Sequence, residues 1–194
     1  MSHLFPKAKQ IVTRIPWPAE SGQAVMEFSL VATMMIVLSF GVIDFSRAIY
    51  LRQVLINLSR ETANLEARGS GTNTLDIMQN ALDATITSAQ PLLLNSANGT
   101  IILTAVTNFN RGYIISEQLS AGTLVRLASS RVGSGVGNAA SLPKTTGSIL
   151  PANHTVYVAE IFYKFTAITP VGHFISSGGI LPTNLYDVAY FSAL

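Results

Sequence analysis

Apolar positions near the N-terminus form one continuous run that has no polar face. Ala24 to Ile43 spans 20 residues, and Glu27 is the only charged residue among them. A run that is apolar on all sides is typical of a helix surrounded by lipid, and about 20 residues at 1.5 Å per residue cross the hydrocarbon core. A core helix covered by protein on every side is the alternative, and it is hard to build in a chain of this size. The pattern therefore predicts a membrane-spanning helix.

The helical period continues beyond this run, with polar residues now separating the apolar ones. The recurring positions are Leu51, Leu55, Leu58, Thr62 and Leu65. Gly69-Ser70-Gly71 is typical of a helix end, so we expect one helix over residues 24–67. A second amphipathic helix is predicted over residues 74–88, with Asn73 or Thr74 as its N-cap. Its expected apolar face comprises Leu75, Met78, Leu82 and Ile86.

The period changes to two in the second half of the chain, which indicates β-strands. Residues 100–109 and 155–165 alternate clearly, and residues 123–129 and 185–192 are shorter candidates. The predicted fold class is α+β: a long N-terminal transmembrane helix followed by a small, mainly antiparallel sheet domain with a second helix. We expect the helices to pack on one side of the sheet.

A short basic segment precedes the apolar run. Lys7, Lys9 and Arg14 outnumber Glu20 there. An ordinary secretory signal has its small-residue cleavage site after the apolar core, whereas Ser21-Gly22 comes before it. Cleavage after Gly22 would leave the apolar helix on the mature chain. We expect the N-terminus inside and the bulk of the chain outside, because long domains translocate largely regardless of charge.

Composition narrows the possible function classes. The 194 residues are 48% hydrophobic and only 11% charged, which excludes a disordered chain and argues against a fully water-exposed monomer. The chain has no cysteine, so disulfides, thiolate nucleophiles and cysteine-ligated metals are excluded. Beyond residue 22 there are 9 basic and 9 acidic side chains, and this balance excludes a basic stripe for nucleic acid.

Charged residues mark both ends of the apolar run. Glu27 lies in the first turns of the predicted helix, where the helix dipole favours a carboxylate. In an assembly of such helices it would instead pair with the free ammonium of a neighbouring chain that starts at Gln23. Asp44 and Arg47 lie at the other end, three residues apart. We expect them at the membrane boundary, either as a pair across one helical turn or as separately solvated groups.

Few residues form a pattern that catalysis or metal binding requires. His3, His154 and His173 have no acidic residue at ligand spacing, so no metal site is predicted. There is no G-x-S-x-G elbow, and the glycine-rich segment 133–143 lacks the lysine of a phosphate-binding loop. We expect this segment to be a mobile loop. No catalytic residue, metal or cofactor is predicted.

Two features of the C-terminal strands have alternative explanations. Glu160 lies on a largely apolar strand, and we expect it on the solvent face beside Lys164 rather than buried as a catalytic acid. Several aromatic residues gather in the same strands, and we expect a packed core there. The alternative is an exposed apolar patch for subunit contact. These residues are Tyr157, Phe162, Tyr163, Phe165, Tyr186, Tyr190 and Phe191.

Three stretches of the chain indicate a family. They are Gly22-Gln23-Ala24-Val25-Met26-Glu27-Phe28 with Phe40-Gly41-Val42-Ile43-Asp44-Phe45; Ser130-Arg131-Val132-Gly133-Ser134-Gly135-Val136-Gly137 with Ser141-Leu142-Pro143; and residues 155–165 with Thr169-Pro170. The first resembles the type IV prepilin cleavage pattern, in which a membrane peptidase cuts after the glycine and the glutamate is fifth in the mature chain. Together the three stretches are similar to the TadE-like minor pilins (pseudopilins) of Tad (Flp-type, type IVb) pilus systems.

The resemblance implies a division of the chain and a set of site residues. Residues 1–22 would be a cleaved basic leader, residues 23–46 a pilin-like transmembrane helix, and residues 47–194 an extracytoplasmic α+β domain with a helical extension at 47–67. Gly22 and Gln23 would form the cleavage site, and Gly22, Glu27 and Phe28 would serve peptidase recognition and assembly. The 172 residues after Gly22 favour a minor component, because a major Tad pilin is little more than the helix.

The resemblance also implies a function and partners. The protein would act in the assembly of a bacterial adhesion pilus by helix packing rather than catalysis. Its partners would be inner-membrane lipid, a prepilin peptidase, other Tad pilins and the assembly platform, joined as a hetero-oligomer through N-terminal helices. We expect a single-pass inner-membrane protein with a cytoplasmic N-terminus and a periplasmic C-terminal domain, or a place on the pilus at the cell surface.

Two alternatives remain open at this point. One is a type II secretion pseudopilin, which differs only in its partners. The other is a membrane-anchored periplasmic enzyme or binding protein. That class would keep an uncut N-terminus and would contain a polar pocket with perturbed titratable groups.

Overall fold

The structure is a computed structural model that describes residues 20–69, 73–109, 112–143, 151–181 and 183–192. The predicted basic leader lies almost wholly outside these residues. Contacts divide the chain into two compact units, residues 1–39 and residues 40–194. The fold class is α+β, as predicted: a long N-terminal helix is followed by an antiparallel four-stranded sheet and further helices.

The first helix, α1 (Glu20–Arg68), runs for 49 residues without a break. It contains no proline, and the Gly69 amide donates to the Glu66 carbonyl oxygen just beyond its end. From residue 44 onward one stripe of the helix is buried, at spacings of three or four residues. The stripe contains the predicted Leu51, Leu55, Leu58 and Thr62, but Leu65 is 43% exposed and does not belong to it.

The second helix, α2 (Thr74–Ser88), has the predicted bounds. Asn73 is the N-cap, and its side-chain oxygen accepts a 2.9 Å hydrogen bond from the Asp76 amide. Met78 and Leu82 are buried as predicted, together with Ala81 and Thr85. The predicted Leu75 is 45% exposed, because the first turn of α2 lies at the edge of the contact.

Four antiparallel strands form one sheet in the order β2-β1-β3-β4. Their bounds are β1 Gly99–Phe109, β2 Gly112–Gly122, β3 Thr155–Lys164 and β4 Asn184–Ser192. β1 and β3 are the central pair, with Leu103 opposite Ala159. β1, β3 and β4 agree with the predicted strands at 100–109, 155–165 and 185–192. Strand β2 was not predicted, because its alternation is weak at the sheet edge and most of its side chains are only half-buried.

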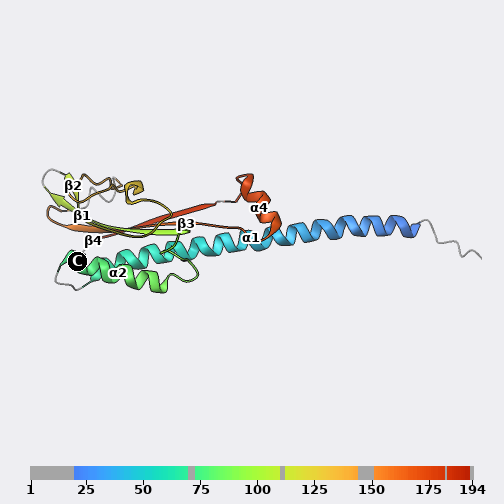
Figure 1. The fold of residues 1–194 in the computed structure, drawn as a ribbon, viewed down its shortest axis with the longest axis horizontal. Coiled ribbons are helices and arrows are strands. Elements are labelled where there is room, and N and C mark those ends of the chain that lie inside the picture. The colour runs from blue at the N-terminus through green and yellow to red at the C-terminus, as the bar shows by residue number, and fades with distance from the viewer. Residues whose placement is uncertain (1–19, 70–72, 110–111, 144–150, 182, 193–194) are drawn as a thin grey trace, which may run out of the picture. The chain divides into compact units, whose positions relative to one another are not determined.

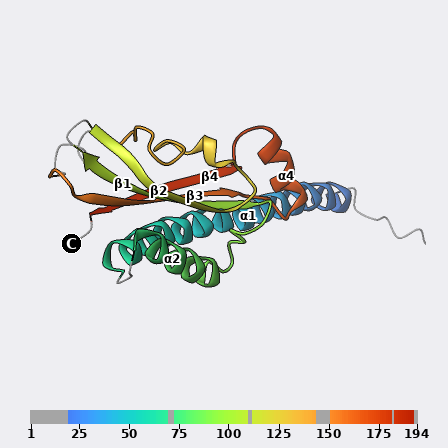
Figure 2. The same ribbon diagram turned by 60° about the vertical axis from the view of Figure 1, so that its left-hand side comes forward.

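One face of the sheet packs on α1 and α2, which lie side by side beneath it in both ribbon views (Figures 1 and 2). Side chains at odd positions of β1 and β3 point toward the helices, and the apolar core fills the space between. This confirms the predicted placement of both helices on one side of the sheet. The core includes Leu55, Met78, Leu82, Ile101, Leu103, Ala159, Ile161 and Phe165.

The other face of the sheet is covered by residues 123–143, a described part of the segment between β2 and β3, drawn mainly in yellow (Figure 2). Val132 is buried against Val106, Val156 and Val158, and Ala139 forms an isolated bridge with Ile114. The predicted strand at 123–129 is wrong, since bends lead there to the short 3-10 helix η1 (Leu127–Ser129). The glycine-rich stretch is packed on the sheet, and Gly133, Gly135 and Gly137 all adopt positive φ values of 86–136°.

A further helix that the sequence analysis did not predict, α4 (Pro170–Ser177), connects β3 to β4. Thr169 is its N-cap, and its hydroxyl accepts a 2.9 Å hydrogen bond from the Gly172 amide. Pro170 occupies the first turn, where a missing amide proton costs nothing. The backbone after the helix folds back through the Gly178, Gly179 and Ile180 amides, which donate to carbonyl oxygens of the last turns.

Candidate functional site

The N-terminal half of α1 exposes its apolar side chains in all directions. Between Val25 and Ile43 the apolar side chains larger than alanine are 36–74% exposed, among them Phe28 at 73% and Met26 at 74%. By length and composition this is a candidate membrane span, and only 6% of its most apolar stretch is buried within the protein. Such a surface is unfavourable in water and requires lipid or other apolar helices around it.

The polar side chains within this half of α1 are satisfied by the helix itself. The hydroxyls of Ser29, Thr33 and Ser39 each donate a 2.8 Å hydrogen bond to the carbonyl oxygen four residues earlier. In a hydrocarbon environment an unpaired hydroxyl is costly, and these internal bonds remove that cost. The helix therefore presents a surface on which these three donors are already used.

The predicted cleavage and assembly residues lie together in the first turns of α1. Gly22 has open space around the position of a Cβ, and it is exposed, as are Gln23, Glu27 and Phe28. The Gln23 side-chain amide donates a 3.0 Å hydrogen bond to Glu27 Oε1 across one turn. This contact holds the carboxylate beside the residue whose backbone nitrogen would be freed by cleavage after Gly22.

Asp44 and Arg47 lie in the second unit, where Asp44 is the first buried residue of α1. Arg47 Nη1 lies 4.0 Å from Asp44 Oδ1, which is an ion-pair distance rather than a hydrogen bond. The guanidinium also lies 5.7 Å from the centre of the Phe165 ring. The structure thus brings the two residues into contact, and their place at a membrane boundary stays a prediction.

The main partners of Asp44 come from the segment that leads into α4. Its carboxylate accepts hydrogen bonds from the Ile168 amide at 3.0 Å, the Thr169 amide at 3.2 Å and the Thr169 hydroxyl. The Asp44 side chain is fully covered by these contacts, but it lies near the surface of the protein, because few atoms surround the residues that cover it. The sequence predicted either a pair with Arg47 or separate solvation for Asp44, and it did not predict these partners. The Thr169-Pro170 pair is the signal that could have identified the start of α4.

Gly172 of α4 lies directly against Asp44 of α1. A Cβ at this position would overlap Asp44 Oδ2 and would lie 2.8 Å from the Ala167 Cβ. Glycine is therefore required for the contact between the first turn of α4 and the Asp44 carboxylate. Asp44, Thr169 and Gly172 form one unit, which we call the Asp44 clamp.

The predicted environment of Glu160 was wrong. Glu160 is fully buried and does not lie on a solvent face beside Lys164. Its carboxylate accepts hydrogen bonds from the Ser130 hydroxyl, the Arg131 amide at 2.9 Å and the Tyr186 hydroxyl at 2.9 Å. The reason is that the segment between β2 and β3 covers this face of the sheet. Burial, with the adjacent Glu160, raises the pKa of Tyr186. The satisfied carboxylate ties the covering segment to β3 and β4.

Glu66 is a second buried carboxylate, on the last turn of α1 that faces the sheet. It is 0% exposed, and neither of its oxygens has a hydrogen-bond partner among the described residues. Burial raises the pKa of Glu66 well above its ordinary value. Tyr157 on β3 lies near enough for Glu66 to contribute to raising the pKa of its phenol, though burial is the larger cause. The helical spacing could have identified Glu66, because it follows the buried Thr62 by four residues, whereas the sequence analysis continued the stripe to Leu65.

The aromatic cluster of the C-terminal strands is divided between the two predicted roles. Tyr157 and Phe165 are buried in the core, whereas Phe191 is 37% exposed. Phe162 and Tyr186 are half-buried and pack with ring centres 4.8 Å apart. Arg131 lies over the Tyr186 ring at 3.8 Å, so this side of the cluster is covered by the segment between β2 and β3.

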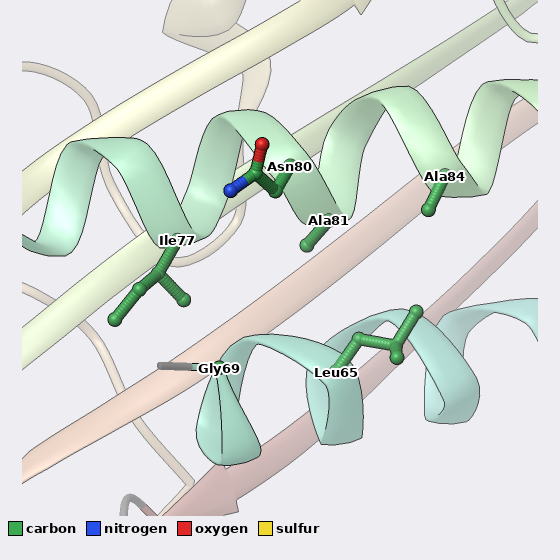
Figure 3. A pocket seen from close by; sticks show the side chains of 6 residues that line it. All are labelled: Leu65, Gly69, Ile77, Asn80, Ala81 and Ala84. Carbon is green, nitrogen blue, oxygen red and sulfur yellow. The ribbon is translucent and has the colours of Figure 1, made fainter. Parts of the chain in front are cut away.

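The remaining candidates for chemistry are not brought together. His154 and His173 are exposed, and His3 lies outside the described residues. Within the described ranges, no group of three or more His, Asp or Glu residues could hold a metal ion. A shallow pocket of about 240 Å³ lies between the C-terminal end of α1 and the middle of α2 (Figure 3). It is lined by Leu65, Gly69, Ile77, Asn80, Ala81 and Ala84, and none of these side chains is titratable.

Comparison with known proteins identifies one part of the chain. The family model described as TadE-like protein matches residues 22–64. No curated protein and no solved structure was found to match. The match begins at the predicted cleavage glycine and covers both the exposed and the buried parts of α1. The other two stretches of resemblance, in residues 130–143 and 155–170, lie outside the matched residues.

The match and the exposed apolar helix agree with each other. A helix that exposes apolar side chains on every side fits an anchor in a membrane. The match confirms the family resemblance over the segment that includes Gly22, Glu27 and Asp44. Residues 22–64 are therefore similar to TadE-like proteins, and the long apolar helix found among the described residues fits a membrane-anchored protein.

Proposed function

We propose that this protein is a minor pilin (pseudopilin) that takes part in assembling a Tad (Flp-type) adhesion pilus and acts by helix packing rather than catalysis. The TadE-like match supports a protein associated with Tad pili. The observation that carries the finer proposal is the exposure of apolar side chains all round residues 22–43. This apolar half of α1 can pack against lipid before assembly and against other pilin helices afterwards.

In this proposal a prepilin peptidase removes residues 1–22 and frees the backbone ammonium of Gln23. Before cleavage the leader keeps the N-terminus cytoplasmic, and residues 47–194 lie in the periplasm. The helix from Gln23 then remains in the inner membrane as the anchor of the mature chain. The α+β domain follows it and, being larger than the helix, favours a place at the tip or base of the filament.

Glu27 would guide the packing of neighbouring helices. A carboxylate near the centre of a membrane helix costs about 2.5–3.5 kcal/mol, and less near its end. In the isolated chain the Gln23 side chain offsets part of this cost through its hydrogen bond. In the assembly, the Gln23 ammonium of a neighbouring helix would neutralise the carboxylate, and the pairing would fix the axial position of one helix against the next.

Processing is tested by substituting Gly22 and a matched glycine. Gly22 and Gly41 both lie in α1, and a Cβ added at either would meet no atom within 4 Å, so valine fits at both. We expect the Gly22→Val chain to remain uncut in cells that contain the peptidase, and the Gly41→Val chain to start at Gln23. Mass spectrometry of the membrane-extracted proteins measures both N-termini. An unsubstituted chain that still carries residues 1–22 in such cells contradicts the proposal.

The role of Glu27 is tested by Glu27→Gln and Glu27→Ala, with Ser29→Ala as the control from the same part of the helix. We expect the two Glu27 variants to reach the membrane but to be lost from assembled pili, whereas Ser29→Ala assembles. The readout is the amount of the protein in sheared pilus fractions. Normal assembly of both Glu27 variants would defeat the pairing.

A further inference from the structure

The α4 region combines apolar exposure with an absence of charge. Residues 165–183 contain no Asp, Glu, Lys or Arg, and His173 is the only titratable side chain in the stretch. Three large apolar side chains are among the most exposed of the second unit: Ile168 at 62%, Phe174 at 81% and Ile180 at 76%. A surface helix in water normally carries charged residues on its exposed side, and this one carries none.

The serine hydroxyls of α4 and several backbone amides at its two ends are bonded within the protein. Ser176 and Ser177 donate to the carbonyl oxygens of Gly172 and Phe174 at 2.6 and 2.7 Å. Asp44 accepts the Ile168 and Thr169 amides, and Thr169 caps the first turn. The amides that follow the helix bond back to its last carbonyl oxygens. A segment that pairs its own backbone and hydroxyl groups can enter a medium of low polarity at small cost.

The Asp44 clamp places this segment where the apolar run of α1 ends. α4 lies beside α1 in both ribbon views, and its first turn is bonded to Asp44 (Figures 1 and 2). The neighbouring side chains of α1 in the same unit are also apolar and exposed, with Val42 at 65% and Phe45 at 57%. Exposed apolar side chains are thus found both on α4 and on α1 next to Asp44, the residue to which α4 is bonded.

We propose that α4 and its flanks, residues 168–180, form a second membrane contact that lies in the interfacial layer of the bilayer from which α1 emerges. Phe174 and Ile180 enter the boundary between headgroups and acyl chains, as apolar side chains of interfacial helices do. The occupant of this surface is lipid, because α4 is bonded to Asp44 at the end of the candidate membrane span and residues 165–183 contain no Asp, Glu, Lys or Arg. The inference rests on α1 spanning the membrane.

With two contacts, the orientation of the second unit is fixed relative to the membrane surface. A single helix allows the domain beyond it to rotate about the helix axis. A second contact, which is attached to α1 through Asp44, would keep the side of the second unit that carries α4 toward the membrane surface. The sheet and α2 would then present the same face to neighbouring subunits in every copy.

The test places single tryptophans in the full chain in proteoliposomes, with Trp17 replaced by phenylalanine. The probe is Phe174→Trp, which fits because Phe174 is 81% exposed. Val136→Trp is the matched control, since Val136 is 61% exposed on the segment that covers the other face of the sheet. Met35→Trp in the membrane segment is the reference. Lipids brominated near the glycerol or near the chain ends quench tryptophans at each depth, and iodide quenches those in water.

We expect a blue-shifted Phe174→Trp emission that shallow brominated lipids quench strongly and iodide does not. Val136→Trp should show the opposite pattern, and Met35→Trp should respond most to the deep bromines. Iodide quenching of Phe174→Trp would overturn the inference, as would a blue shift without bromine quenching, which would indicate a protein partner. If Met35→Trp is also unquenched by lipid, the membrane span fails as well, so the two failures are distinguishable.

Discussion

The two halves of α1 have similar backbones but opposite surroundings. Residues 22–43 expose nearly every side chain, whereas residues 44–68 bury one stripe against the sheet and α2. The buried stripe includes polar contacts that fix the helix in place. The hydroxyls of Thr62 and Thr85 are 2.8 Å apart between α1 and α2, and Ser59 donates to Asp187 on β4. The difference shows that one continuous helix can change its surroundings within a single turn, because α1 has almost no buried side chain before Asp44 and a buried stripe from Asp44 onward.

The largest effect is expected from cutting a core side chain in the second half of α1. Leu55 is completely buried, and Leu55→Ala should destabilise the second unit by about 3–5 kcal/mol, through lost burial and the cavity left behind. Leu38→Ala in the first half is the matched variant, because Leu38 is 53% exposed. Denaturant unfolding in detergent micelles measures both. A similar loss from both variants would mean that the halves are not distinct.

The next effect concerns the Asp44 clamp at the change between the halves. Asp44→Ala removes the acceptor for two backbone amides and the Thr169 hydroxyl, and it should cost about 2–4 kcal/mol. In the Asp44→Ala variant, hydrogen exchange at residues 168–172 should be faster than in the unsubstituted chain, whereas exchange in the sheet should change less. Asp83→Ala, which changes an exposed residue of α2, should leave both measurements nearly unchanged. Unaltered protection of residues 168–172 in Asp44→Ala would show that the clamp does not hold α4.

A smaller effect separates two glycines of the α4 region. Gly172→Ala forces a methyl group against the Asp44 carboxylate and should cost about 1–3 kcal/mol by overpacking. Gly178→Ala meets its nearest atoms at 3.6 and 3.8 Å, with a φ of −79°, so it should be tolerated. Thermal unfolding of the two variants in micelles gives the comparison. Equal stability would contradict the close approach of α4 to α1.

The smallest effect depends on pH and arises at the end of the buried half. The pKa of Glu66 is raised in the folded state, so folding binds a proton there. Stability should therefore fall as pH rises from the ordinary value of 4.5 through the raised pKa. Glu66→Gln should match the unsubstituted chain at low pH and be more stable at high pH. Glu61→Gln, at an exposed site on the same helix, should keep the fall with pH.

Periodicity in the sequence predicted the elements whose side chains alternate between two clear environments. α1, α2, β1, β3 and β4 are of this kind, and their bounds agree with the structure within a few residues. Residues 123–129 alternate as well, but the bends there direct them over the sheet instead of into it. β2 was missed because, at the sheet edge, both of its faces are half-buried and no period stands out.

The candidate site was predictable where it depends on neighbours in sequence and not where it depends on distant contacts. Gly22, Gln23, Glu27 and Phe28 lie on adjacent turns, so the sequence alone groups them. The partners of Asp44 are more than 120 residues away in the chain. Glu160 was assigned to the wrong environment for the same reason, because Ser130 and Tyr186 reach it only through the fold.

If the first half of α1 packs against other helices as proposed, the hydroxyls that bond back into this helix have a consequence for that packing. The hydroxyls of Ser29, Thr33 and Ser39 donate to carbonyl oxygens of their own helix. Contacts between adjacent helices at these positions would therefore consist of van der Waals packing without hydrogen bonds from these hydroxyls. Van der Waals packing without directional hydrogen bonds allows neighbouring helices to slide and rotate against one another. A bundle of such helices would be flexible along its length, and the axial register of one helix against the next would depend on the few charged groups near the helix ends.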